Sequence, residues 1–151
     1  MESVEKSVEV KVPVRAAYDQ WTQFEQFPQF MEGVKEVQQV ADDQLHWVAE
    51  IAGQREEWDA RITEQTPDQR IAWTSINGSA RNAGVVTFHQ LSEDRTKVML
   101  QLDYEPEGVK EQIGDALGLV GRRVEGDLER FKEFVESGAG TSGGWRGEIR
   151  N

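Results

Sequence analysis

Residues 44–64 read QLHWVAEIAGQREEWDARITE, two runs of alternating apolar and polar residues separated by Gly53. A period of two places successive side chains on opposite faces of a β-strand. The apolar residues of the two runs then share one face of a hairpin: Leu45, Trp47, Ala49, Ile51, Trp58, Ala60 and Ile62. Two indoles on one face predict an antiparallel hairpin whose buried side is unusually aromatic.

The same alternation extends in both directions from this hairpin. We expect strands at residues 3–12, 34–40, 44–51, 54–64, 69–77, 80–91 and 96–105. Turn residues such as Pro67-Asp68 and Asn77-Gly78 separate them, and short connections imply an antiparallel meander. Trp73, Phe88 and Tyr104 join the aromatic face, although the strand of Phe88 also has apolar residues on its other side.

Three segments have helical rather than strand spacing. After Pro13, residues 14–24 place apolar side chains on one side of a helix, and residues 27–31 predict a short turn that Pro28 interrupts. Residues 119–137 predict a long amphipathic helix with one apolar stripe, formed by Val120, Val124, Leu128, Phe131 and Val135. Residues 109–118 contain Gly114 and Gly118, so we expect a loop or a fragile helical turn there.

The length of 151 residues predicts one domain over residues 1–137, followed by a glycine-rich flexible tail at residues 138–151. Trp145 is unusual in such a tail. Two interpretations stay open, a free end or an indole that docks on a groove or a second subunit. The chain is expected to be a monomer or a homodimer.

Composition excludes several classes of partner and chemistry. The formal net charge of −11 argues against nucleic acid and against an anionic membrane surface. No apolar run approaches the ~20 residues that cross a bilayer, and the first residues lack a secretion signal, so we expect a cytoplasmic protein. The absence of cysteine excludes disulfides and thiolate metal sites.

The polar residues offer little catalytic machinery. His46 and His89 alternate with inward-facing aromatics and should face solvent, so we expect no metal site and no cofactor. No nucleophile elbow or phosphate-binding loop is present. Glu56 shares its strand face with Trp58, and Tyr104 ends another strand, so these two are weak catalytic candidates. A water-accessible Glu56 and a Tyr104 that only caps the core are the alternatives.

Residues 12–34, VPVRAAYDQWTQFEQFPQFMEGV, resemble the opening of bacterial polyketide cyclase/dehydrase-like proteins. These belong to the SRPBCC superfamily, with START domains and coenzyme Q-binding proteins. Later segments fit the same group: His46-Trp47, Glu57–Ala60, Arg70–Trp73 and Asp127–Lys132. The resemblance covers roughly residues 3–136.

The resemblance implies an α+β helix-grip fold, in which a curved seven-stranded antiparallel sheet wraps around the long C-terminal helix. Two short helices lie between strands 1 and 2, and an apolar cavity lies between sheet and helix. The predicted ligand-binding residues are Phe30, Met31, Trp47, Trp58, Trp73, Phe88, Tyr104, Ile113, Leu117, Leu128 and Phe131. Phe30, Met31, Ile113 and Leu117 are expected near the mouth.

The leading functional hypothesis is the binding of a small hydrophobic molecule, such as a lipid, a quinone or a polyketide-like compound. A polyketide cyclase, aromatase or dehydratase acting in the same cavity is the second hypothesis. A scaffold with a filled core is the third.

Overall fold

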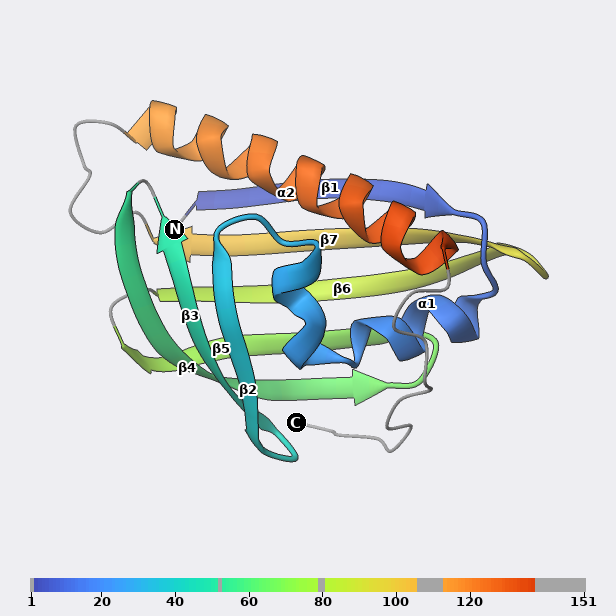
Figure 1. The fold of residues 1–151 in the computed structure, drawn as a ribbon, viewed down its shortest axis with the longest axis horizontal. Coiled ribbons are helices and arrows are strands. Elements are labelled where there is room, and N and C mark those ends of the chain that lie inside the picture. Colours follow the sequence, from blue (N-terminus) through green and yellow to red (C-terminus); the bar gives the residue numbers. More distant parts are fainter. Residues whose placement is uncertain (1, 52, 79–80, 106–112, 138–151) are drawn as a thin grey trace.

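The computed structural model describes residues 2–51, 53–78, 81–105 and 113–137 (Figure 1). Seven strands form one antiparallel sheet in the order β1-β7-β6-β5-β4-β3-β2. Their bounds are β1 Glu2–Val10, β2 Val34–Ala41, β3 Gln44–Ile51, β4 Gln54–Thr66, β5 Arg70–Gly78, β6 Arg81–Ser92 and β7 Arg95–Glu105. The predicted seven-stranded antiparallel meander is confirmed, and β1 forms one edge of the sheet by pairing with β7.

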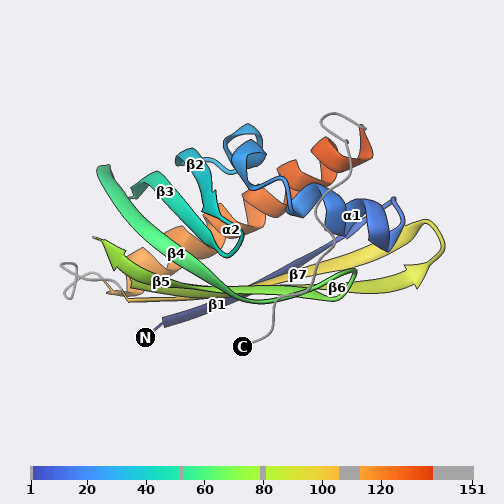
Figure 2. The ribbon, with the colours of Figure 1, turned by 90° about the horizontal axis from the view of Figure 1, so that it is seen from below.

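The sheet is strongly curved, and β2, β3 and part of β4 curl around the helices (Figure 2). β4 changes register twice against β5, between Asp59 and Ala60 and between Ile62 and Glu64. Such bulges increase the local twist and bend a strand. The second register change also changes which side chains face inward, so that Gln65 is only 1% exposed. Strict alternation from Ile62 predicts the opposite face for Gln65, because a bulge shifts the period by one residue.

The helices lie on the inner side of the curved sheet, which we call the concave face (Figures 1 and 2). They are α1 Val14–Trp21, the 3₁₀ helix η1 Phe24–Gln29 and α2 Ile113–Glu136. Two predicted boundaries were wrong. α1 ends at Trp21 rather than residue 24, and α2 begins six residues before the predicted 119.

α2 begins earlier than its glycine residues would predict. Each interior glycine costs a helix about 1 kcal/mol relative to alanine. Extending an existing helix adds one hydrogen bond per residue without a new nucleation cost. Of the two expectations for residues 109–118, a loop or a fragile helical turn, the structure therefore has the helical one from Ile113 onward, in spite of Gly114 and Gly118.

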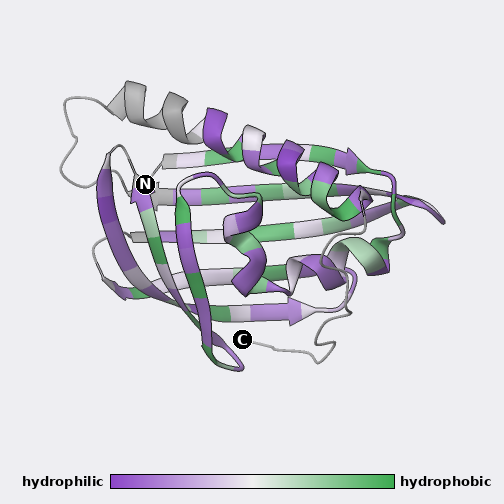
Figure 3. Ribbon diagram, viewed as in Figure 1, coloured by the Kyte–Doolittle hydropathy of each residue, from purple (hydrophilic) through white to green (hydrophobic). Residues whose placement is uncertain are grey.

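The core lies between the concave face, α1, η1 and α2. Hydrophilic and hydrophobic residues alternate along the strands and around α2, as this two-layer arrangement requires (Figure 3). In the described part of the chain, no helix has the length and apolar character needed to span a bilayer. Residues 138–151, including Trp145, lie outside the described residues.

Candidate functional site

The tryptophans of β3, β4 and β5 are buried on the concave face, where the sequence placed them. Trp47 and Trp58 are direct cross-strand partners, and Trp73 lies opposite Ile62 on the next strand. Phe88 on β6 is also buried, and Leu91 is exposed, so the inward direction of Phe88 is confirmed. Ligand contact by these residues stays a prediction.

Trp47 and Trp58 form a parallel pair that we call the tryptophan stack. Their ring centroids are 5.7 Å apart and their planes differ by 8°. Both Nε1 atoms are shut off from solvent, and neither has a hydrogen-bond partner in the part of the chain that the structure describes. An unsatisfied buried donor costs about 1–3 kcal/mol. The stack therefore contains two polar groups that the described residues do not satisfy.

The indole of Trp73 packs closely against the backbone of β6 at Gly84. The two residues are register partners, and a Cβ atom added at Gly84 would come within 2.5 Å of Cζ2 of Trp73. A glycine therefore makes room for the indole to lie against the sheet instead of projecting from it. Alternation predicted the burial of Trp73 but not the need for glycine opposite it.

A second group of aromatic side chains fills the space beside α1, η1 and α2, and we call it the aromatic plug. Its members are Trp21, Phe27, Phe30, Phe88 and Phe131. Most of their rings meet edge to face, with centroids 5.0 Å apart for Trp21 and Phe131 and 5.3 Å apart for Phe30 and Phe131. This geometry is the favoured one for aromatic pairs in a packed core. Phe27 connects the plug to the tryptophan stack, because its ring lies 5.5 Å from that of Trp47.

The structure divides the predicted ligand-binding residues between these regions. Phe30, expected near the mouth, is fully buried within the plug, and Met31 beside it is also buried. Leu128 and Phe131 face the sheet from α2, as predicted. The side chains of Tyr104, Ile113 and Leu117 lie outside the described residues.

Asp127 on α2 is a partly buried carboxylate that was not among the predicted site residues. Its Oδ1 accepts hydrogen bonds from the backbone N–H of Glu32 at 2.9 Å and from Nη2 of Arg130 at 2.5 Å. Burial raises the pKa of Asp127 to about 6, although the hydrogen bonds from Arg130 and Glu32 oppose this shift. Arg130 also donates from Nε to the carbonyl of Phe30 at 2.9 Å. Asp127 and Arg130 thus fasten α2 to the segment that follows η1.

The weak catalytic candidate Glu56 is half-buried on β4 opposite Ala49. Its partial exposure agrees with the interpretation that its side chain reaches water near the strand end. Other polar side chains, including Gln20, Gln65 and Thr96, are buried more deeply. The buried amide of Gln65 on the concave side had no sequence signal, because it depends on the β4 bulge.

Both histidines point away from the interior, as predicted. His46 lies on the outer face, where Nδ1 is 2.7 Å from Oδ1 of Asp59 and Nε2 is 3.2 Å from Oε1 of Glu57. The hydrogen bond to Asp59 is the main reason why the pKa of His46 is raised. Among the described residues, no group of three or more His, Cys, Asp or Glu side chains is arranged to hold a metal ion.

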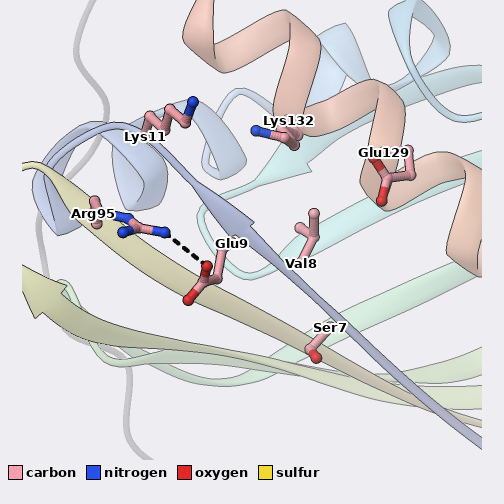
Figure 4. Close-up of a pocket in the computed structure, with 7 residues that line it drawn as sticks. All are labelled: Ser7, Val8, Glu9, Lys11, Arg95, Glu129 and Lys132. Carbon is pink, nitrogen blue, oxygen red and sulfur yellow. Dashed lines mark hydrogen bonds and ion pairs between the residues drawn. The ribbon is translucent and has the colours of Figure 1, made fainter.

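A separate surface pocket of about 390 Å³ lies between β1 and α2 (Figure 4). Its lining residues are Ser7, Val8, Glu9, Lys11, Arg95, Glu129 and Lys132. Two of its cations are paired: Arg95 with Glu9 at 2.9 Å, and Lys132 with Glu136 at 2.6 Å. The mixed charge of this pocket contrasts with the apolar concave face and does not suit a hydrophobic ligand.

Comparisons with known proteins agree with this architecture. The family described as "Polyketide cyclase / dehydrase and lipid transport" matches residues 10–133. An uncharacterised 17.2 kDa protein of Streptomyces lincolnensis is 56% identical, with 99% of each chain covered. A crystal structure from Deinococcus radiodurans has a TM-score of 0.71 at 25% identity, covering 91% of this chain and 99% of that one. The Zhui aromatase/cyclase of Streptomyces sp. R1128 has the same fold, with a TM-score of 0.74 at 16% identity, covering 95% of this chain and 99% of that one.

Proposed function

Because this chain belongs to the polyketide cyclase/dehydrase and lipid transport family, we propose that it binds a small hydrophobic molecule between the concave face and α2. The observation that carries this proposal is the convergence of Trp47, Trp58 and Trp73 on one concave surface. Sites for small apolar molecules are concave and lined mainly by aromatic and aliphatic side chains, with few polar groups.

The two aromatic regions favour one end of the interior over the other. The plug is packed edge to face and offers no broad aromatic surface. The tryptophan stack instead consists of two parallel rings, and the Trp73 indole packs closely against the sheet beside them. We therefore place the ligand against β3, β4 and β5. A lipid chain, a quinone or a polyketide-like aromatic compound fits such a surface.

Nile red, an apolar dye whose emission rises in apolar surroundings, tests this proposal. We expect wild-type protein to bind it with increased dye emission and altered tryptophan emission. Trp58→Ala should weaken binding at least tenfold, because it removes one indole of the stack. Circular dichroism must first show that the variant is folded, since truncating a buried tryptophan costs about 3–5 kcal/mol.

Ile76→Ala is the matched control for this experiment. Ile76 is a large apolar residue on β5, but its side chain is exposed, so its loss should leave dye binding unchanged. If the wild-type protein binds no dye, or if both folded variants bind like wild type, the concave face is not a binding surface.

The alternative is a cyclase, aromatase or dehydratase that acts on a polyketide-like substrate in the same interior. The observation that favours it is Glu56, a half-buried carboxylate on the strand of Trp58 that could move protons. Glu56→Gln should then abolish turnover of a linear poly-β-ketone while leaving its binding intact. A variant with undiminished turnover would exclude Glu56 as the acid or base.

A further inference from the structure

The buried indole N–H groups of Trp47 and Trp58 indicate what kind of ligand the interior recognises. Each residue is 7% exposed, and each Nε1 is cut off from solvent. An indole nitrogen can only donate a hydrogen bond, so it needs an acceptor atom. Within the described residues neither nitrogen has one.

Among the described residues, no side chain around the stack supplies that acceptor. Glu56 precedes Trp58 on the same face of β4 and carries a carboxylate, but neither indole nitrogen donates to it. The nearer neighbours are apolar. Leu45 and Ala49 flank Trp47 on its face of β3, and Ala60 and Ile62 follow Trp58 on its face of β4. All four are hydrocarbon. Phe27, which contacts Trp47, also has no polar atom in its side chain. Solvent is excluded from both nitrogens, and the described residues leave them without an acceptor, so a molecule that enters the interior could supply one.

The stacked geometry defines where the acceptor must lie. An indole N–H bond lies in the plane of its ring, and the two planes differ by only 8°. Both bonds therefore leave the stack at its edge and not through its faces. A carbonyl oxygen has two lone pairs and suits such an edge, whereas an alkyl chain offers no acceptor at all.

Trp21 shows that a buried indole N–H does not always require a ligand. Its Nε1 is also buried without a partner among the described residues, but its ring is surrounded by phenyl rings at steep angles. Aromatic faces accept weak N–H···π contacts. The parallel rings of the stack do not offer their faces to each other's N–H bonds in this way. Trp47 has a phenyl neighbour in Phe27, but the two planes meet at 45°, less steeply than those around Trp21.

We propose that the ligand is a carbonyl-bearing aromatic molecule, a ketone or a quinone, whose oxygen accepts hydrogen bonds from the indole N–H groups of Trp47 and Trp58. This inference rests on the proposed function and narrows it. The two tryptophans become specificity-determining residues that distinguish oxygenated ligands from hydrocarbons of the same shape.

The test uses 9-fluorenone and fluorene, which share one tricyclic skeleton but differ by a carbonyl against a methylene group. Equilibrium dialysis gives both dissociation constants for wild type, Trp47→Phe and Trp58→Phe. Phenylalanine keeps an aromatic ring but removes the donor. We expect each variant to lower the preference for fluorenone over fluorene about tenfold, the value of one buried hydrogen bond. Ile76→Ala is the control, because Ile76 is exposed on β5 and lies outside the proposed site, so its preference should equal that of wild type.

A second measurement on wild-type protein does not depend on variants that fold. With ¹⁵N-labelled indoles, fluorenone should shift the N–H resonances of Trp47 and Trp58 downfield, and fluorene should not. The Trp21 resonance serves as the internal reference.

The outcomes separate this inference from the proposed function. Suppose that both compounds bind, that every variant keeps the wild-type preference for fluorenone, and that fluorenone does not shift the N–H resonances of Trp47 and Trp58. Then the proposed binding of hydrophobic molecules stands, but the proposed hydrogen bonds to a carbonyl are wrong. If neither compound binds wild-type protein, both proposals fail together.

Discussion

The tryptophan stack and the aromatic plug are built from the same kind of side chain, yet they pack in opposite ways. In the plug, rings meet edge to face from several directions and fill the space between α1, η1 and α2. In the stack, two rings lie parallel and keep two donors without partners in the described structure. Aromatic residues facing the same interior can therefore fill one region by tight packing and, in another region, keep hydrogen-bond donors available for a ligand.

The largest expected effect comes from removing the centre of the plug. Phe131 is fully buried and contacts Trp21 and Phe30, so Phe131→Ala leaves a cavity that neighbouring rings cannot fill without losing their geometry. We expect a loss of about 3–5 kcal/mol of unfolding free energy, measured by urea titration. Nile red binding per folded molecule should stay close to that of wild type.

Phe134→Ala provides a matched comparison on the same helix. Phe134 is only partly buried and contacts Phe30 from outside the plug. Phe134→Ala should therefore lower the unfolding free energy clearly less than Phe131→Ala does. Equal costs for the two variants, or loss of dye binding in folded Phe131→Ala, would show that the plug is not a separate packed region.

The distinction between these regions could be predicted only in part from the sequence. Alternation identified the strands and placed Trp47, Trp58 and Trp73 inward, because a period of two leaves little choice once one face is buried. The stripe through Leu128 and Phe131 identified the inner side of α2 for a similar reason. These inferences needed only local spacing.

Features that depend on contacts between distant segments could not be predicted. Gly84 is essential to Trp73 only because β5 and β6 pair at that position. Asp127 is partly buried and hydrogen-bonded only because the Glu32 backbone, 95 residues earlier, meets α2 there. The inward turn of Gln65 depends on a register change between β4 and β5. No pattern in one segment contains this information.

The second prediction concerns Asp127, which fastens α2 beside the plug. Its pKa is about 6 in the folded protein against 3.8 ordinarily, so the folded state binds this proton more tightly than the unfolded chain. The stabilisation from protonation is complete below pH 3.8 and is lost as pH rises through about 6. Asp127→Asn carries no charge to bury, so its stability relative to wild type should increase by up to about 3 kcal/mol between pH 4 and pH 7.

Urea titrations of both proteins at several pH values measure that difference. Glu133→Gln, at an exposed position on the same helix, controls for the change in net charge. A difference between Asp127→Asn and wild type that does not change with pH would mean that this end of the molecule is too open to water to perturb a carboxylate.

Gly84→Ala has the smallest expected effect on stability, and it tests the region where we propose that the ligand binds. Gly84→Ala adds a Cβ atom that would lie 2.5 Å from Cζ2 and 2.7 Å from Cε2 of Trp73, so the indole must tilt away from the sheet. We expect a cost of about 1–2 kcal/mol from overpacking. The tilted ring enters the space that we assign to the ligand, so Nile red and fluorenone should both bind more weakly while the plug stays intact.

Gly121→Ala makes the same chemical change on α2 where the space is open. The added Cβ would meet only Cε of Lys6, at 3.9 Å, and alanine in place of a helical glycine should raise stability by up to about 1 kcal/mol. The two substitutions should thus have opposite signs. If Gly84→Ala were as stable as wild type and bound both compounds normally, Trp73 would be free to move without consequence. The aromatic surface would then be incidental packing, and the contrast between the tryptophan end and the plug would lose its functional meaning.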